Sequence, residues 1–576
     1  MTEAIPSVGV LTAAEIERSA FTMLDDHLRQ IPGFSLFRRS SSLSAHPTTQ
    51  GVSLRGIGPS GTSRSLVLFD GTPLNDPFGG WVYWNRLPTL ALRAVEVSAG
   101  STSPLYGSAA MGGTIQILAR RPEAGVLEVR GAAGTEDTVD AEFFASSRGA
   151  EWGHVVAGRV FSTDGFFIVD KDVRGEIDVP ASLEFGSFFG RVHHGRTFAG
   201  VNLYREERGN GTQIQENNSR IALLEAGHDG ESWEWRLFWQ SQHFESTFSR
   251  VLADRSEEFL TAEQSFPSTG AGASLAWSNE RGLRVGADWR RASWERRDQD
   301  LVGLFVQGDA RVNPRLNLLL GARLDVWENE STQSTVNPRA GILWRLSEKV
   351  NVRGSVYRGF RAPTLNELYR PFRVGNVETL ANAALSEEHL WGAETGVDFH
   401  PARPAWMRVN VFYNSLRDPV GNQTLSVSAT GVLRQRQNLG RATIRGVEAE
   451  GRLHLGPAWR LRAGYLFSDA IVEETGLRLP QVPRHQGSFS VTYLGWIEAT
   501  LEGRASSNQY EDDLNVLGLG SYAIVNLSLR RRLHARATLF LEAENILDET
   551  YAVGRLPVER LGTPRLVRGG IRMRFR

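Results

Sequence analysis

The last ten residues of the chain alternate between apolar and positively charged side chains, and this alternation limits the possible folds more than any other feature. One set is Val567, Ile571, Met573 and Phe575, and the other is Arg568, Arg572, Arg574 and Arg576. Since successive side chains of a β-strand point to opposite faces, one face would be apolar and the other would carry four arginines. Soluble sandwiches do not easily bury such a strand, but the wall of a transmembrane barrel has lipid outside and a wet lumen inside. The pattern therefore predicts a strand of a membrane-spanning β-barrel.

Similar alternation covers much of the chain after about Ala124. Alternating apolar and polar residues run through the segments 459–468, 497–502, 523–530 and 538–544. No helical pattern interrupts this part, so we expect no helix across roughly 450 residues. A membrane strand with its share of loop takes roughly 20 residues, which gives about 22 antiparallel strands over residues 122–576. A barrel of that size has a lumen wide enough to need an obstruction.

The composition agrees with a barrel and excludes several other classes. Mean hydropathy is −0.27, and no apolar stretch approaches the roughly 18 residues that a membrane helix needs. Alternating strands keep mean hydropathy low, so a barrel is compatible with this value. A net charge of −1 argues against a nucleic-acid partner. The absence of cysteine excludes disulfides and thiolate metal sites.

The first 121 residues have a different pattern and are expected to form a separate α+β domain. Thr12 and Glu15 form a capping-box pattern that predicts a short helix. A second helix is expected from Thr22 to Ile31, where Pro32-Gly33 would end it. Short strands are expected at residues 52–55, 66–69, 95–97 and 114–118.

Several short motifs follow one another through this N-terminal domain. They are residues 28–34 (LRQIPGF), 52–56 (VSLRG), 66–74 (LVLFDGTPL), 95–97 (VEV) and 105–115 (LYGSAAMGGTI). In this order and spacing they resemble the plug of TonB-dependent outer-membrane receptors. Residues 360–364 (FRAPT) and 545–548 (NILD) are similar to segments of the barrel of the same family. The resemblance therefore covers essentially the whole chain.

The resemblance implies a protein of the bacterial outer membrane, in contact with lipid and lipopolysaccharide, that acts as a monomer. A solute would bind from outside, and the inner-membrane protein TonB would pull on the plug from the periplasm. The sequence begins without a secretory signal and shows no convincing TonB box. Both are expected to lie upstream of Met1.

The expected activity is active import of a scarce, bulky solute. A ferric siderophore is the first expectation because it is the family's commonest cargo, and cobalamin (vitamin B12) is the alternative. A passive porin or surface adhesin is the alternative of another class, and the N-terminal plug argues against it. No HExxH, GxSxG or P-loop motif is present. We therefore expect neither a catalytic site nor a cofactor.

Two plug loops, residues 40–50 and 77–85, are expected to face outward and to contact the ligand. Aromatic rings there would offer flat apolar surface, and the polar side chains would offer hydrogen bonds. The candidate ligand-binding residues are Ser44, His46, Trp81, Tyr83, Trp84 and Asn85. The alternative is that these aromatic residues only pack the plug against the barrel wall.

Three charged plug residues are expected to hold the plug in place. Arg55, Arg93 and Glu96 lie beside plug strands, where ion pairs with lumen carboxylates such as Glu542 or Glu544 are expected. A polar, hydrated interface of this kind would let a pulled plug rearrange without exposing apolar surface.

Two further patterns are given structural interpretations. Residues 56–61 (GIGPSG) match a dinucleotide fingerprint, but a strand rather than a helix is expected to follow, so we interpret them as a tight turn. Glu511, Asp512 and Asp513 could bind calcium in an outer loop. A solvated loop face is the preferred interpretation, and no metal site is predicted.

Overall fold

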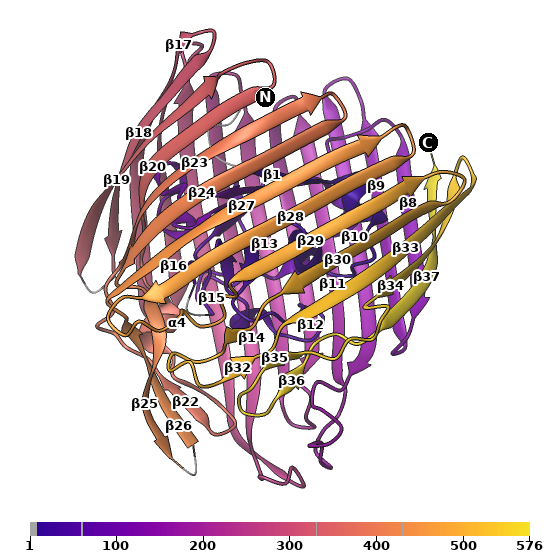
Figure 1. The fold of residues 1–576 in the computed structure, drawn as a ribbon, viewed down its shortest axis with the longest axis vertical. Coiled ribbons are helices and arrows are strands. Elements are labelled where there is room, and N and C mark those ends of the chain that lie inside the picture. Colours follow the sequence, from indigo (N-terminus) through magenta and orange to yellow (C-terminus); the bar gives the residue numbers. More distant parts are fainter. Residues whose placement is uncertain (1–7, 59–60, 330, 429–430, 576) are drawn as a thin grey trace.

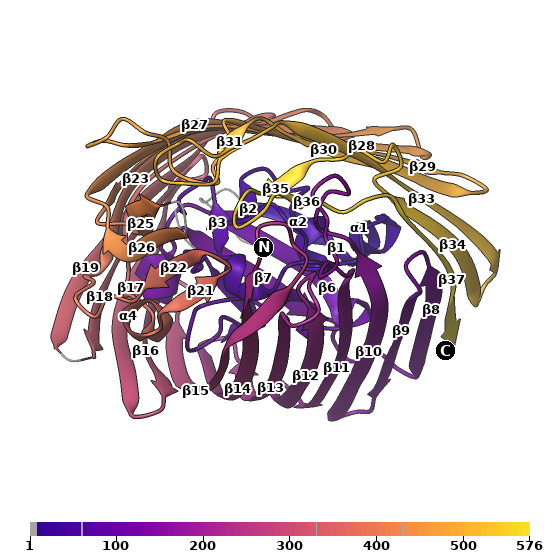
Figure 2. The same cartoon turned by 90° about the horizontal axis from the view of Figure 1, so that it is seen from below.

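The computed structural model describes residues 8–58, 61–329, 331–428 and 431–575. The chain forms a ring of long strands with a small domain inside it (Figures 1 and 2). The predictions about the start of the chain, about Pro59 and about the terminal Arg576 lie outside the described residues.

The ring is a closed barrel of 22 strands, as predicted. Consecutive strands pair antiparallel, and the last strand, β37 (Leu566–Phe575), pairs with the first, β8 (Val126–Gly134), to close it. The strands between them are β9 (Thr138–Arg148), β10 (Trp152–Phe166), β11 (Ala181–His194), β12 (Thr197–Gly209), β13 (Glu216–Asp229), β14 (Trp233–Val251), β15 (Glu258–Ser278), β16 (Leu283–Trp294), β17 (Arg297–Asn313), β18 (Leu316–Glu328), β19 (Thr332–Arg345), β20 (Val350–Arg361), β23 (Glu388–Ala402), β24 (Ala405–Arg417), β27 (Arg441–Leu455), β28 (Trp459–Val472), β29 (His485–Leu494), β30 (Glu498–Ser506), β33 (Tyr522–His534) and β34 (Ala537–Glu544).

The alternation that predicted the barrel separates its two faces. On β34, Leu539 and Leu541 are exposed on the outer surface, whereas the neighbouring Glu542 is buried in the lumen. On β37, Arg568 is likewise buried and Ile571 is exposed. The outward set is apolar along the strands, which suits contact with lipid.

The two ends of the barrel differ in the length of their connections. Turns of two to four residues join the strands at one end. At the other end, long connections span residues 167–180, 362–387, 418–440 and 545–565, and β25 (Val420–Ser428) and β26 (Gly431–Asn438) project from this end in Figure 1. Short turns are periplasmic and long loops extracellular in barrels of the outer membrane. We assign the long-loop end to the outside on this basis.

One helix in the barrel region contradicts the prediction that none would occur there. α4 (Leu365–Tyr369) begins in the loop after β20. Thr364 accepts the backbone N–H of Glu367, whose carboxylate accepts the N–H of Thr364, so a complete capping box starts it. This is the Ser/Thr-x-x-Glu signal that was recognised at Thr12. It was overlooked in a segment too short to show helical periodicity.

Extracellular loops carry further short strands besides those of the wall. Among them, β21 (Phe372–Val374) and β22 (Val377–Leu380) join β26 and β25 in a four-stranded sheet. The others are β31 (Gln509–Tyr510) with β32 (Gly518–Leu519), and β35 (Ala552–Gly554) with β36 (Arg560–Leu561). In Figure 2 these loops lie around and over the plug.

The plug is built on a five-stranded sheet in the order β1-β6-β7-β4-β5. A core of buried apolar residues packs this sheet against the short helices. Its elements are β1 (Val8–Thr12), α1 (Ala13–Arg18), α2 (Leu24–Leu28), β2 (Phe34–Leu36), β3 (Val52–Leu54), β4 (Leu66–Phe69), β5 (Thr72–Pro73), β6 (Leu92–Ala99), α3 (Ser103–Tyr106) and β7 (Gly113–Ala119), with short 3-10 turns at Pro47–Thr49, Trp84–Arg86, Thr89–Ala91 and Ser108–Ala110.

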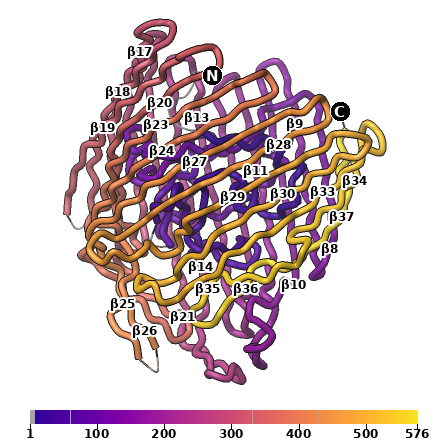
Figure 3. Tube along the Cα trace, in the orientation of Figure 1, coloured from indigo at the N-terminus to yellow at the C-terminus, as the bar shows by residue number. Residues whose placement is uncertain are grey.

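The capping box at Thr12 is confirmed and starts α1. The second predicted helix is shorter than expected, because α2 ends at Leu28, three residues before Ile31. A strand follows residues 56–61, which agrees with interpreting them as a turn. None of the described helices is long and apolar enough to cross a membrane. Figure 3 shows the chain of the plug enclosed by the inclined strands.

Candidate functional site

A cavity of about 170 Å³ lies at the extracellular end of the plug. The plug loop of residues 37–49 forms one side of it. The other sides come from the extracellular end of β14, from the segment that follows α4, from strand β26 and from strand β36. The plug and four extracellular parts of the barrel, which are far apart in sequence, therefore meet around one space open to the outside. We refer to it as the outer cavity.

Arginines give the outer cavity its charge. They come from the plug and from three different extracellular loops, and no carboxylate lines the cavity among the residues that the structure describes. The four arginines are Arg38, Arg370, Arg436 and Arg560. A concave site with cationic walls and no acidic ones attracts anions.

Two of these arginines are held by neutral groups. Arg436 donates from Nη1 to the carbonyl oxygens of Asn366 and Arg370, both at 2.6 Å. Arg370 lies over the ring of Phe266 at 4.3 Å and donates to Gln264 at 3.2 Å. Burial, reinforced by the nearby Arg436, lowers the pKa of Arg370 to about 9, and burial lowers the pKa of Arg436 to about 10. Both shifts arise first from burial, which the attraction of Glu367 for Arg436 and of Asp76 for Arg370 offsets only in part.

Arg560 is only partly satisfied, although Glu511 attracts it. Its Nε atom is buried and has no hydrogen-bond partner among the described residues. Burial and the neighbouring Arg38 lower the pKa of Arg560 to about 10. Buried polar groups are normally hydrogen-bonded, so a guanidinium with an unsatisfied N–H at a cavity is a position at which an anion would bind favourably.

Aromatic rings form the floor of the outer cavity. The ring of His46 stacks on Phe244 with centroids 4.7 Å apart, and Trp81 meets the same phenylalanine edge to face at 6.0 Å. Burial, together with the charges of Arg208 and Arg370, holds the pKa of His46 well below its usual value. His46 is therefore neutral at physiological pH and adds a polar but uncharged edge.

The structure divides the six predicted ligand-binding residues into two groups. Ser44, His46 and Trp81 line the outer cavity. The other three are buried and do not line it: the Tyr83 hydroxyl accepts from Gln242 of the wall at 3.2 Å, Trp84 packs on Phe34 in the plug core, and Asn85 lies in the 3-10 turn of residues 84–86. Their positions match the packing alternative instead.

Arg55 ties the plug to the wall, as predicted, but through different carboxylates. It donates to Glu394 of β23 at 2.5 Å and to Glu448 of β27 at 2.9 Å. The expected partners lie elsewhere on the wall: Glu542 pairs with barrel arginines, and Glu544 accepts from the backbone N–H of Thr22 at 2.9 Å. Period-two alternation identifies lumen-facing carboxylates, but it does not specify which strand a plug residue faces.

The other two predicted gating residues make no such contact. Arg93 is exposed at the periplasmic end, and Glu96 lies opposite Gln116 in the plug sheet. Among the described residues no ion pair is recorded for either side chain. Both lie on β6, which pairs with β1 and β7 inside the plug sheet.

A second plug–wall contact was missed by the sequence analysis. Arg64 of the plug donates from Nε to Glu388 of β23 at 3.0 Å. Arg361, the arginine of the FRAP segment, donates to the same carboxylate at 2.8 Å and also binds Glu367 of α4. This buried network joins the plug to the helix whose following residues line the outer cavity.

The arginines of the outer cavity were also missed. Arg370, Arg436 and Arg560 lie in three separate loops, and no local pattern in the sequence distinguishes them from other loop arginines. The sequence offers one indication of this cluster, which is the number of arginines in the loops that the barrel brings together at its extracellular end.

The acidic run in the loop after β30 is used by the protein itself. Asp512 accepts the backbone N–H of Leu517 at 2.7 Å, and Asp513 accepts from Thr424. Glu511 lies 3.6 Å from Arg38. Within the described ranges no cluster of His, Cys, Asp and Glu has the geometry of a metal site.

The fold and this site define a class of protein. It is an outer-membrane β-barrel whose lumen is closed by an internal plug and whose extracellular end holds a cavity lined by arginines and aromatic rings. The family model "TonB dependent receptor-like, beta-barrel" matches residues 167–546, and the model "TonB-dependent Receptor Plug Domain" matches residues 2–114. The chain belongs to the TonB-dependent receptors.

Several known proteins are similar to this chain along most of its length. The iron-regulated outer membrane virulence protein of Vibrio cholerae is 22% identical, with 94% of this chain and 88% of that protein covered. The vitamin B12 transporter BtuB of Vibrio vulnificus is 22% identical over 95% and 88% of the two chains. Among solved structures, the siderophore receptor PirA of Acinetobacter baumannii has a TM-score of 0.80 at 15% identity and covers 99% of this chain and 98% of its own.

Another structural relative is the ferric enterobactin receptor PfeA of Pseudomonas aeruginosa. A mutant of it has a TM-score of 0.77 at 15% identity and covers 99% of this chain and 98% of its own. The family and the fold are those of receptors and transporters rather than enzymes, and they are found in the outer membrane. The family and the fold therefore favour the importer over the porin and adhesin alternatives.

Proposed function

We propose that this receptor imports an anionic ferric chelate, of the catecholate siderophore type, and that TonB drives the transport. The carrying observation is the outer cavity, in which four arginines and several aromatic rings converge with no carboxylate among the described lining residues. Ferric tris-catecholate complexes combine a net negative charge with flat aromatic rings. Arginine binds the charge and stacks on the rings, so one wall serves both properties.

The size of the cavity implies that the loops move on binding. About 170 Å³ is smaller than the roughly 300–1,000 Å³ of ordinary ligand pockets. The loops of residues 362–387 and 418–440 carry Arg370 and Arg436 and would separate to admit a chelate. Closing again around the ligand would bring their cations onto it and exclude water.

An energy source is needed because the plug is tied to the wall. Buried ion pairs at Arg55 and Arg64 hold it on the β23 and β27 side. Passive diffusion past these contacts would be slow, whereas a mechanical pull from the periplasm would break them in sequence. TonB, which the family name identifies, is the proposed partner for this step.

Cobalamin is the second candidate, because several relatives are vitamin B12 transporters. It is bulky, but it does not carry the strong negative charge that a cavity lined by four arginines and no carboxylate would favour. Charge therefore separates the two candidates better than size does.

The test is equilibrium binding by the purified, full-length protein in detergent. The probes are a ferric catecholate complex, a neutral ferric hydroxamate complex and cyanocobalamin. We expect the catecholate to bind at least tenfold more tightly than either of the others. We also expect Arg560→Gln to weaken it by about tenfold or more, since charge-assisted hydrogen bonds contribute roughly 1.5–3 kcal/mol.

The matched control is Arg555→Gln, a nearby arginine that pairs with Glu559 at 3.2 Å in the same loop but does not line the cavity. It should bind as the wild type does. Tight binding of cyanocobalamin without binding of the catecholate would overturn the proposal in favour of the vitamin. An unchanged affinity in the Arg560 variant would show that the cavity is not the site.

A further inference from the structure

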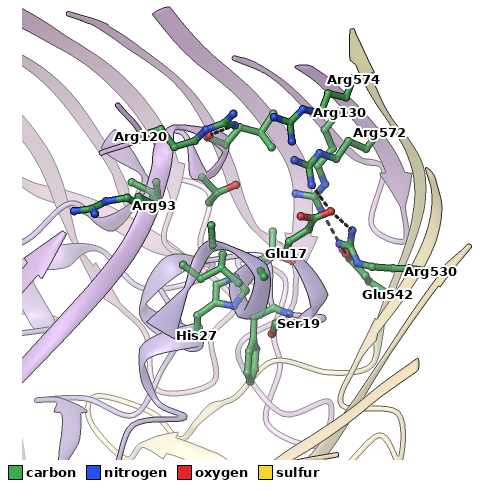
Figure 4. A pocket seen from close by; sticks show the side chains of 18 of the residues that line it. Glu17, Ser19, His27, Arg93, Arg120, Arg130, Arg530, Glu542, Arg572 and Arg574 are labelled. Carbon is green, nitrogen blue, oxygen red and sulfur yellow. Dashed lines mark hydrogen bonds and ion pairs between the residues drawn. The ribbon is translucent and has the colours of Figure 1, made fainter. Parts of the chain in front are cut away.

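A second, larger cavity of about 520 Å³ lies at the periplasmic end between the plug and the wall (Figure 4). We refer to it as the inner cavity. α1 of the plug forms one side, and strands β8, β33, β34 and β37 form the other. Its described lining residues include seven arginines and three glutamates. Like the outer cavity, it has an excess of positive charge.

On the wall of the inner cavity, arginines outnumber the carboxylates that they share. Glu542 is the common partner of Arg130, Arg530 and Arg568, at 3.0, 2.8 and 2.8 Å. Glu128 is likewise shared by Arg120, Arg572 and Arg574. Each carboxylate therefore compensates only part of the charge around it.

The plug supplies one more carboxylate to this wall. Glu17 of α1 lies 3.3 Å from Arg530 and forms an ion pair with Arg572, and Figure 4 shows its side chain reaching both arginines. α1 follows β1 directly, and β1 is an edge strand of the plug sheet. A displacement of this part of the plug would therefore take Glu17 away and leave both arginines without it.

A small third cavity, of about 50 Å³, borders the part of the plug chain between the parts that border the other two, and we refer to the interface of plug residues 13–49 with the wall as the seam. It lies between plug residues 29–39 and strands β28, β29 and β30 of the wall. Arg29, Arg39 and Arg504 line it, and the described lining again contains no carboxylate. Arginines thus line all three cavities of the seam, although Asp26 pairs with both Arg29 and Arg504 beside the middle one.

One continuous stretch of the plug borders all three cavities in chain order. Residues 13–27 border the inner cavity, residues 29–39 the middle one and residues 37–49 the outer one. Moving this stretch away from the wall would join the three spaces into a single passage. The passage would lead from the ligand site to the periplasm.

We propose that the anionic solute leaves the barrel along this seam, and that Arg530 and Arg572 bind it at the periplasmic exit once Glu17 has been withdrawn. In the closed receptor Glu17 pairs with the two arginines, and these ion pairs hold the plug against the wall. In the open receptor the passing anion takes the place of the glutamate. The inference rests on the proposed function, because it requires an anionic cargo and a displaced plug.

A purely structural latch makes a different prediction from an exit site. If the contact only holds the plug, removing Glu17 and removing the arginines both loosen it, so both changes alter transport in the same direction. If the arginines also bind the solute, the two changes have opposite effects. Glu17→Gln frees the two arginines before the plug is displaced, whereas Arg530→Gln with Arg572→Gln removes the exit site.

The experiment compares initial uptake rates of a labelled ferric catecholate by TonB-energised cells that carry each full-length variant. Binding at the outer cavity is measured separately in de-energised cells. We expect Glu17→Gln to transport at the wild-type rate or faster. The double arginine variant should transport at least tenfold more slowly with unchanged surface binding, and Arg530→Lys with Arg572→Lys should recover most of the rate.

The matched control removes two lumen arginines from the opposite wall. Arg284→Gln with Arg290→Gln on β16 leaves the seam intact and should transport at the wild-type rate. Equal slowing by Glu17→Gln and by the double arginine variant would overturn the exit site in favour of a latch. A normal rate in the double arginine variant would overturn the route. Failure of the wild type to bind the chelate would instead refute the proposed function.

Discussion

The Nε atom of Arg64 in the plug donates to the Oε2 atom of Glu388 in the barrel wall at 3.0 Å, and both side chains are completely buried. Arg361 shares the same carboxylate, so one glutamate joins the plug, the wall and the loop that follows β20. The stabilisation that this contact provides depends on both partners being present. Removing one partner of a buried pair costs about 3–5 kcal/mol, and the lower end applies to Arg64 because Glu388 keeps Arg361 as a partner.

We expect Arg64→Gln to loosen the plug without unfolding the barrel. The variant should show ionic conductance in planar bilayers at a lower urea concentration than the wild type, because the contact that it loses is part of plug docking. A loss of about 3 kcal/mol is expected. Arg93→Gln removes an exposed plug arginine and serves as the control, with a wild-type midpoint. Equal midpoints for Arg64→Gln and the wild type would contradict the role of the pair.

Trp81 should report on occupation of the outer cavity. Its indole is buried against Phe78 and Phe244 and borders the cavity, so a bound ferric chelate would quench its fluorescence. The chain has 15 tryptophans, so the measurement is the difference between the wild type and Trp81→Phe during a titration. We expect the variant to lose a distinct part of the quenching, while Trp459→Phe on the outer face loses none. Identical quenching in all three proteins would place the ligand elsewhere.

Asp76 gives the plug a predictable dependence on pH. Burial raises the pKa of Asp76 to about 7, opposed by the N–H groups of Gly79 and Phe78. In the unfolded chain an aspartate titrates near 3.9. Between these values the folded plug holds a proton that the unfolded plug has lost. The stabilisation is therefore complete below about pH 4 and is lost as the pH rises to about 7.

Asp76→Asn removes this dependence. We expect the free energy of plug unfolding in the wild type to fall by an amount on the order of 3 kcal/mol more than in the variant between pH 4 and pH 8. The urea midpoint of plug opening, measured at both pH values, provides the comparison. Superimposable pH profiles of the two proteins would show that Asp76 is ionised throughout.

Much of the fold follows from local chemistry. The alternation around Arg568, Arg572 and Arg574 predicts strands with a charged lumen face, and the structure confirms the closed barrel of 22 strands. The capping box at Thr12 likewise identifies the start of α1. These features depend on neighbours two to four residues apart, which a sequence displays directly.

The site depends on contacts that the sequence does not display. Arg370, Arg436 and Arg560 meet only because the barrel brings three loops to the same mouth. Which carboxylate faces Arg55 depends on how the plug is rotated inside the ring, and no local pattern encodes that angle. Residues such as Trp84 were assigned to the ligand because aromatic side chains suit both a binding surface and a core.

The most direct test of the account is uptake of a labelled ferric catecholate by iron-starved cells that lack their own catecholate receptors. The cells would carry this chain with a secretion signal and would be compared with and without TonB. We predict accumulation only when both proteins are present, with no accumulation of labelled cobalamin. Equal accumulation without TonB, or uptake of cobalamin alone, would contradict the account.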